Sequence, residues 1–170
     1  MTNPDQHSGL PNETEVDLTP SRLSAKKNTV RVFYKDLWDK ADLGLVPKIF
    51  HPEFTFRGSL GPVLVGHRQF SDYVSWLTQA LDDYTSEILD LVEEGNRVSG
   101  KLRFHGIHRE TLFGERPTNA RVWWYGAPIF TFDGPLVRDL WVLGDVYGLR
   151  SRLDPAWAQR LSFNSTQTKP

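Results

Sequence analysis

The sequence of 170 residues contains no cysteine and a single methionine. The lack of cysteine excludes disulfides, thiolate catalysis, and zinc or iron–sulfur sites built on cysteine. An excess of one charge is also lacking, because 20 basic and 21 acidic residues give a net charge of −1. Binding to nucleic acids or anionic membranes usually needs a one-signed surface, so we expect neither as a partner. No apolar run is long enough to cross a bilayer.

The composition is that of one globular domain, with 39% hydrophobic and 24% charged residues. Six Trp, ten Phe and five Tyr favour a rigid aromatic interior, which suits a packed core or a pocket for a flat organic ligand. The polar, aperiodic ends predict a disordered tail over 1–25, a single domain over 26–160 and a second disordered tail over 161–170. Nothing at the start resembles a signal peptide, so we expect a cytoplasmic location.

Apolar residues recur at helical spacing in three places before residue 83. A stripe begins near Thr29, a short pattern covers 45–50, and a third covers 68–82. From 84 onward the period drops to two, with turns at Gly95-Asn96 and Asp133-Gly134. Three helices followed by long antiparallel strands predict an α+β domain in which a curved sheet wraps around helices.

Two polar residues share a strand face with large apolar side chains. His108 ends the buried face of the strand over 97–108, and Asp145 lies in the last, largely apolar strand. An unpaired carboxylate in such a place is costly, so Asp145 needs a partner or a function. Structural explanations stay open, since Asp145 could cap a turn or pair with Arg57 or Arg150, and His108 could bond to backbone groups.

Other motifs point to no specific chemistry. His105 and His108 are three residues apart on a strand and therefore face opposite ways, which argues against a metal site. The sequence shows no Gly-rich phosphate loop, serine nucleophile elbow or DxD pair. Taken without context, Trp123, Trp124 and Trp141 are explained as core residues.

Several strings together resemble a known family. FYKDLWDKADLGLVPKIFHPEFTFRG, RFHGIHRETLFGERPTNARVWW and IFTFDGPLVRDLWVLGDVYGLRSRL are similar to SnoaL-like polyketide cyclases, also called ester cyclases, over about Thr29 to Leu153. The motifs that carry the resemblance are Gly106-x-His108, Leu112-Phe113-Gly114 with Pro117-Thr118, and Trp141-x-x-x-Asp145. The family belongs to the nuclear transport factor 2-like (cystatin-like) superfamily, as does ketosteroid isomerase.

The resemblance implies a cone-shaped α+β barrel in which a strongly curved mixed sheet wraps around three N-terminal helices and encloses a deep apolar pocket. It also implies that no cofactor and no metal is used. Asp145 would be the general acid/base and His108 would assist it. The chemistry would be proton removal next to a carbonyl, enolate formation and an intramolecular aldol closure of a small hydrophobic or polyketide-like molecule.

Further residues are expected to bind this substrate. Arg57 or His108 would stabilise the enolate, and aromatic side chains would line the pocket, namely Tyr34, Trp38, Phe104, Trp124 and Trp141. The sequence departs from the family pattern at Arg109, Glu110 and Asn119. We therefore expect a more polar pocket mouth, or one closed by an Arg109–Glu110 pair.

Two other functions compete with the cyclase or isomerase. One is a hydrolase or dehydratase, in which Asp145 and Arg57 would activate water. Asp139, the other acid on that strand face, is roughly 20 Å from Asp145 at about 3.3 Å per residue, too far for a carboxylate pair. The other is a non-catalytic ligand-binding or protein-interaction module, whose partner surface would be marked by Trp123, Tyr125 and Ile129. A homodimer through the sheet is compatible with all three.

Overall fold

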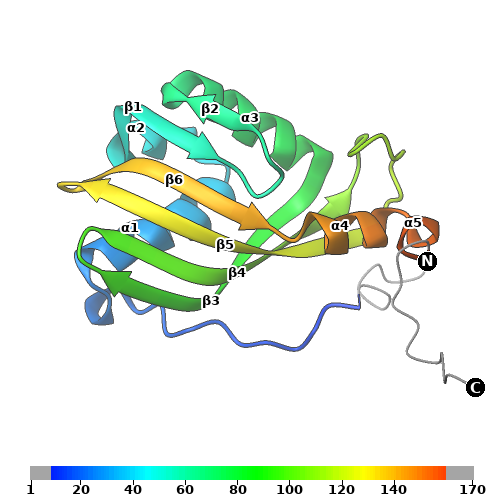
Figure 1. Cartoon of the computed structure of the whole chain (residues 1–170), viewed down its shortest axis with the longest axis horizontal. Coiled ribbons are helices and arrows are strands. Elements are labelled where there is room, and N and C mark those ends of the chain that lie inside the picture. Colours follow the sequence, from blue (N-terminus) through cyan, green and yellow to red (C-terminus); the bar gives the residue numbers. More distant parts are fainter. Residues whose placement is uncertain (1–8, 160–170) are drawn as a thin grey trace, which may run out of the picture.

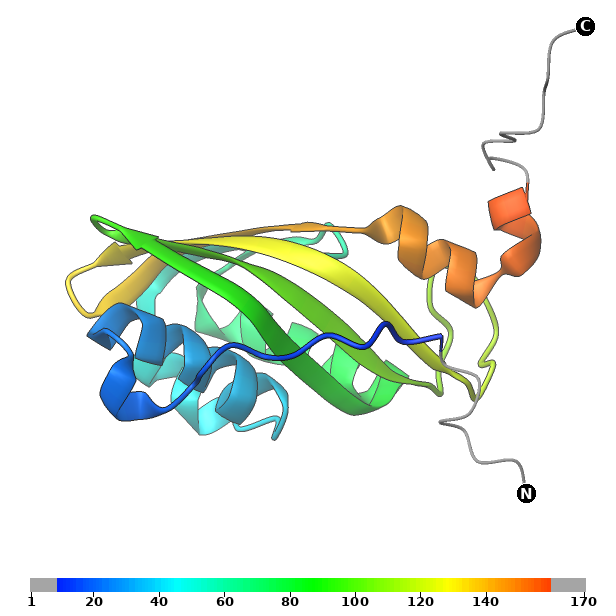
Figure 2. The same cartoon turned by 90° about the horizontal axis from the view of Figure 1, so that it is seen from below.

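The computed structural model describes residues 9–159 as a curved sheet with helices against its concave side (Figures 1 and 2). The predicted α+β class is confirmed. In chain order the helical segments are η2 (Pro20–Arg22), α1 (Ala25–Val32), η3 (Phe33–Trp38), η4 (Leu43–Leu45), α2 (Val46–Ile49), α3 (Gly66–Ala80), α4 (Val146–Leu153) and α5 (Pro155–Gln159). The strands are β1 (Phe50–Arg57), β2 (Val63–Val65), β3 (Leu81–Glu94), β4 (Arg97–His108), β5 (Arg121–Asp133) and β6 (Leu136–Gly144).

Within these residues the strands form one sheet in the order β2-β1-β6-β5-β4-β3. Neighbouring strands are antiparallel except β1 and β6, which run parallel, so the sheet is mixed as expected. The long strands β3 to β6 curve over α1, η3 and α3, as Figure 2 shows. The sheet does not close on itself, because β2 and β3 remain edges. The shape is therefore an open cone.

The first helix begins with a side-chain cap and ends as a wider turn. The Oγ of Ser24 accepts a hydrogen bond from the backbone N–H of Lys27 at 3.1 Å, which stabilises the start of α1. The segment η3 is π-helical, and the N–H of Asp39 donates to the carbonyl of Tyr34 five residues earlier at 3.1 Å. It buries Phe33, Tyr34, Leu37 and Trp38. The predicted apolar stripe is confirmed, and its π turns were not foreseen.

The core lies between this stripe, α3 and the concave side of the sheet. It is rich in aromatic rings: Phe33 packs edge-on against Phe50 and Phe130, and Phe50 stacks on Phe54 with ring centroids 4.0 Å apart. Helix α3 adds the buried Phe70, and also Val74 and Leu77. Such edge-on and stacked pairs each contribute about 0.5–1.5 kcal/mol beyond their buried area. The predicted aromatic interior is confirmed.

The N-terminal segment differs from expectation. Residues 9–19, predicted to belong to a disordered tail, run along β3 and across the outer side of β4 (Figure 2). The N–H of Val16 donates to the carbonyl of Ile88 at 2.9 Å. Arg103, 2% exposed, donates to Pro11 and Glu87 and pairs with Glu13. A buried guanidinium needs several acceptors, and this segment supplies some of them.

The C-terminal part also differs from expectation. The last strand was predicted to continue through Asp145, but β6 ends at Gly144 and the chain turns into α4 and α5. Residues 146–149 have the sequence Val-Tyr-Gly-Leu, which is compatible with a strand, and the Asp145 side chain caps a helix there instead. The predicted tail over 161–170 lies outside the described residues. In the part described, no helix is long and apolar enough to span a membrane.

These chain ends cover much of the surface that we expected to bind a partner. The guanidinium of Arg152 from α4 lies 3.3 Å from the ring centroid of Trp123. The hydroxyl of Tyr125 donates to Glu13 at 2.6 Å. Of the three residues expected to mark that surface, Ile129 remains exposed, at 39%. Dimerisation through the sheet stays a prediction.

Candidate functional site

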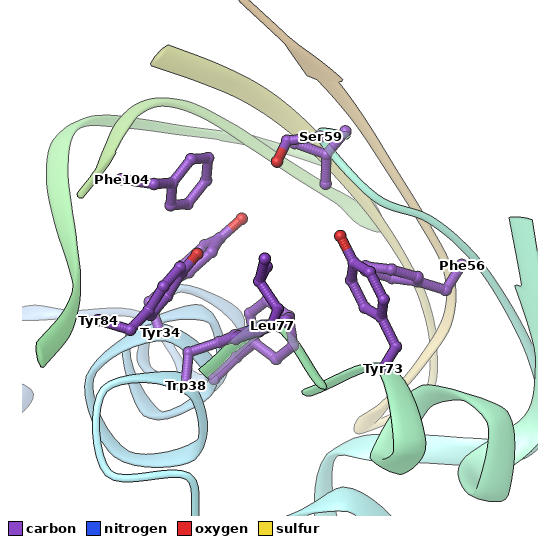
Figure 3. Close-up of a pocket in the computed structure, with 10 residues that line it drawn as sticks. Tyr34, Trp38, Phe56, Ser59, Tyr73, Leu77, Tyr84 and Phe104 are labelled. Atoms are coloured by element: carbon purple, nitrogen blue, oxygen red, sulfur yellow. The ribbon is translucent and has the colours of Figure 1, made fainter. Parts of the chain in front are cut away.

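A small cavity lies inside the cone, between the helices and the concave side of the sheet (Figure 3). Its volume is about 20 Å³. A space of that size holds about one water molecule, or one oxygen of a ligand. It is lined by Phe33, Tyr34, Trp38, Phe56, Ser59, Tyr73, Leu77, Tyr84, Phe104 and Val142. The expected deep pocket is thus mostly filled with aromatic side chains.

Besides the indole N–H of Trp38, the polar side-chain groups that this lining offers are hydroxyls. Figure 3 shows the hydroxyls of Tyr34, Tyr73, Tyr84 and Ser59 turned toward a common space. The Oη of Tyr34 is buried and has no hydrogen-bond partner among the described residues. Leaving a buried polar group unpaired costs roughly 1–3 kcal/mol, so such a group calls for an explanation. Tyr34 also belongs to the π-helical segment, a feature that is frequent at functional sites.

Ser59 is held in place from two sides. The indole N–H of Trp124 donates to Ser59 Oγ at 3.1 Å, which leaves the hydroxyl hydrogen of Ser59 free to be donated elsewhere. Gly144 at the end of β6 packs against the backbone of Ser59, and a Cβ at Gly144 would overlap the Ser59 carbonyl oxygen. A glycine is therefore required there for the loop to reach the cavity. Trp124 was predicted to touch substrate, and in the structure it positions Ser59.

The phenols of the cavity are neutral over the physiological pH range. Burial raises the pKa of Tyr34 and that of Tyr73 far above the ordinary value near 10. Burial also raises the pKa of Tyr84, and the charge of Asp39 adds to that increase. The cavity can therefore donate and accept hydrogen bonds, but its phenols do not become phenolate bases.

Asp145 is placed differently from the sequence expectation. Its Oδ1 accepts a hydrogen bond from the N–H of Gly148 at 2.9 Å, so it caps the N-terminus of α4. The residue lines a shallow depression on the outer side of the sheet, together with Lys101 and Leu143, and not the interior cavity. The expectation that Asp145 lies within the last strand is wrong, because β6 ends at Gly144. Its catalytic role stays a prediction.

His108 is fully buried at the end of β4, as expected. The backbone N–H of Thr118 donates to Nδ1 at 3.2 Å, so the ring hydrogen of the neutral imidazole is on Nε2. Nε2 has no partner among the described residues. Burial lowers the pKa of His108 below its ordinary value. His108 does not line the interior cavity, and in the part described no hydrogen bond joins it to Asp145.

Comparison with known proteins identifies the family. A sequence profile described as SnoaL-like polyketide cyclase matches residues 28–153. The chain belongs to the SnoaL-like polyketide cyclase family. No curated protein sequence matches it significantly.

Solved structures show the same fold as this SnoaL-like chain. A candidate polyketide cyclase from Acidithiobacillus ferrooxidans is 23% identical, with a TM-score of 0.70 over 79% of this chain and 98% of the other. A candidate SnoaL-like polyketide cyclase from Jannaschia is 14% identical, with a TM-score of 0.69 over 84% and 97%. A protein of ketosteroid isomerase-like fold from Catenulispora acidiphila is 12% identical, with a TM-score of 0.60 over 71% and 88%. At such identities these likenesses establish the fold, and they confirm the predicted fold class.

The remaining predicted substrate residues of this SnoaL-like chain divide into two groups. Tyr34, Trp38 and Phe104 line the cavity. Arg57 and Trp141 are paired on β1 and β6 outside it. Arg57 donates to the carbonyl of Val142 at 2.5 Å, and its guanidinium lies 5.5 Å from the centre of the Trp141 ring. Both point away from the cavity because their neighbours along the strands, Phe56 and Val142, point into it.

The expected Arg109–Glu110 pair is not what the structure forms. Arg109 pairs with Asp82, at 3.6 Å, and donates to the Asn119 side chain at 3.0 Å. Asn119 has a φ of 55°, which explains why a glycine suits this position in the family pattern and why asparagine is tolerated. Within residues 9–159, no three His, Asp or Glu side chains gather as a metal site would require.

Sequence reasoning missed three of the hydroxyl residues. Tyr73 and Tyr84 lie on the buried sides of a helix and a strand, where the periodicity had marked large apolar positions. A tyrosine at such a position carries a hydroxyl into the core, and that was the available signal. Ser59 lies in the loop between β1 and β2, so no periodicity could indicate its direction.

Proposed function

We propose that this SnoaL-like protein is a cofactor-independent cyclase or isomerase for enolisable carbonyl compounds, and that its interior hydroxyls hold a carbonyl or enol oxygen of the substrate. The observation that carries the proposal is the buried Tyr34 hydroxyl, unpaired among the described residues and facing a space of about 20 Å³. A ligand oxygen placed there would pair this hydroxyl. Ser59, with its hydrogen free to be donated, would supply a second hydrogen bond.

Neutral hydroxyls suit a proton relay in this reaction. In the enol form of a β-dicarbonyl unit, the α-carbon of the enol attacks a third, more distant carbonyl carbon of the same molecule. One carbon–carbon bond forms, the π bonds of the enol C=C and of the attacked C=O break, and the enol oxygen becomes a ketone oxygen. A hydroxyl accepts the enol proton while it gives its own proton to the new alkoxide, and so ends unchanged. Such groups need no titration near neutral pH.

The rate acceleration would come from preorganised hydrogen bonds in a site that excludes most water. One donor aimed at a developing oxyanion typically contributes 10²–10³ in rate. The rings around the hydroxyls, among them Trp38 and Phe104, exclude water and keep the local dielectric low. Asp145 and His108, which the sequence suggested for this work, do not line the cavity.

One observation favours a second candidate, a ligand-binding protein without catalysis. The lining contains no carboxylate and no imidazole, so the cavity itself offers no base that titrates near neutral pH. Nothing similar favours the hydrolase. Asp139 is bonded to Thr55, Arg57 is bonded to a backbone carbonyl, and neither lines the interior.

Turnover of a synthetic substrate tests the proposal. An aryl-capped 1,3,5,7-tetraketone can close a six-membered ring by aldol addition, and its absorbance reports the closure. We expect acceleration by the wild-type protein, a loss on the order of 10² in Tyr34→Phe, and no change in Tyr147→Phe, a tyrosine on α4 that is 48% exposed. Equal rates in wild type and Tyr34→Phe would overturn the proposal. Binding without acceleration would establish the second candidate instead.

A further inference from the structure

A second pocket lies next to the interior cavity, at the surface. It has a volume of about 360 Å³ and is lined by Leu60, Pro62, Tyr73, Trp76, Leu112 and Phe113, which we call the mouth pocket. Two of its rings are unusually exposed for their size, Trp76 at 48% and Phe113 at 37%. We propose that the mouth pocket binds a planar, apolar ring system of the substrate, whose carbonyl end reaches the interior hydroxyls past Tyr73. This inference rests on the proposed function.

The interior cavity and the mouth pocket share one lining residue and one loop. The ring of Tyr73 is half-buried and lines both of them. The loop after β1 also serves both, because Ser59 faces the interior while Leu60 and Pro62 line the mouth pocket. The interior has room for about one oxygen, so the body of any larger ligand has to lie outside it. The mouth pocket is the adjoining space, and its volume is within the range of small-molecule sites.

The lining of the mouth pocket specifies the kind of ligand. Tyr73 and Trp76, one turn apart on α3, are stacked with ring centroids 5.8 Å apart and planes 29° apart. Phe113 contributes a further ring from the loop between β4 and β5, and the other lining residues are aliphatic or proline. Flat rings gain most from offset or edge-on contact with such side chains. The chemistry therefore fits a fused aromatic or polyketone-derived ring better than a charged or flexible polar molecule.

Phe113 is partly exposed, yet its ring and its loop make specific contacts with neighbouring residues. Phe113 has a φ of 51°, a conformation that costs energy for a residue other than glycine. The guanidinium of Arg150 lies 5.9 Å from the Phe113 ring centre and 5.0 Å from that of Trp157. Backbone bonds between Leu112 and Glu115 close the loop beneath it. Arg150 of α4 thus packs against an exposed ring whose backbone is strained, and such strain is common at ligand-binding sites.

Binding of two matched probes tests the inference. 2-Acetylnaphthalene carries a flat ring and a carbonyl, and naphthalene carries the ring alone, so equilibrium dialysis with each separates the two sites. We expect Trp76→Ala to weaken both probes about tenfold, and Trp76→Phe to restore most of the affinity. Trp141→Ala is the control, because Trp141 is similarly exposed, at 39%, but does not line the mouth pocket.

The outcomes distinguish this inference from the proposed function. Equal affinities of wild type and Trp76→Ala, or equal losses in Trp76→Ala and Trp141→Ala, would overturn the mouth pocket as the ring site. The interior site is tested separately by Tyr34→Phe, which should weaken the ketone and leave naphthalene unchanged. If Trp76→Ala weakens both probes while Tyr34→Phe weakens neither, the mouth pocket stands and the proposed role of the interior hydroxyls fails.

Discussion

Replacing Asp145 separates a helix cap from a catalytic acid/base. The carboxylate caps α4 through its bond to the Gly148 N–H at 2.9 Å. Asparagine offers the same acceptor and is an equally good cap, whereas alanine offers none. We therefore expect Asp145→Ala to lower the free energy of unfolding by about 1 kcal/mol. Asp145→Asn should cost less, chiefly through the loss of negative charge at the helix N-terminus and near Arg152, whose pKa burial lowers and Asp145 raises.

Urea denaturation and turnover of the tetraketone together give the assay. With a denaturant slope of roughly 2 kcal/mol/M, the alanine variant should unfold at about 0.5 M lower urea, and the asparagine variant close to wild type. Both variants should keep wild-type turnover at low urea. A general acid/base at this position would instead make both variants at least 10²-fold slower. A slow Asp145→Asn variant with an unchanged urea midpoint would therefore refute our inference that the residue acts as a cap alone.

Three further predictions follow from individual contacts. Gly144→Ala should displace the Ser59 loop, with a loss of roughly 1–3 kcal/mol in urea melts and a parallel loss of ketone binding; unchanged binding would contradict the packing argument. Arg103→Met should destabilise the fold by roughly 1–3 kcal/mol, because Glu87 loses its buried partner, and a neutral result would show that the N-terminal contacts are dispensable. Burial lowers the pKa of His108, so the unfolded chain takes up a proton before the folded protein does as the pH falls. The free energy of unfolding should therefore decrease below about pH 6.5, and it should decrease less in His108→Gln. Turnover should stay constant from about pH 7 to 9, because the cavity phenols remain neutral.

Hydrophobic periodicity predicted the helices and strands that bury one face and expose the other. The stripe from Val30 to Trp38 and the alternation along β4 marked Tyr34, Trp38 and Phe104 as interior positions, and all three line the cavity. The end of β6 was missed, because the uncharged residues Val146 to Leu149 could equally continue the strand. What decides it is the Asp145 cap, a hydrogen bond between residues three apart, which a hydrophobic pattern does not contain.

The candidate site was predicted less completely than the fold. A carboxylate and an imidazole are the usual candidates for proton transfer, and the sequence offered Asp145 and His108 in apolar surroundings. The interior is instead polar through hydroxyls on residues that count as core side chains, such as Tyr84. The role of Ser59 depends on two contacts that are distant in sequence, with Trp124 and Gly144. Such contacts follow from the tertiary structure and not from local pattern.

The most direct test of the account is the effect of Tyr34→Phe on stability and on ligand affinity, measured on the same protein. Under the proposed function, this hydroxyl is kept, at a cost to the fold, in order to bind a ligand oxygen. Removing it should leave the free energy of unfolding unchanged or raise it by up to about 1 kcal/mol, while the affinity for 2-acetylnaphthalene falls roughly tenfold. A clear loss of stability together with unchanged affinity would contradict the central claim.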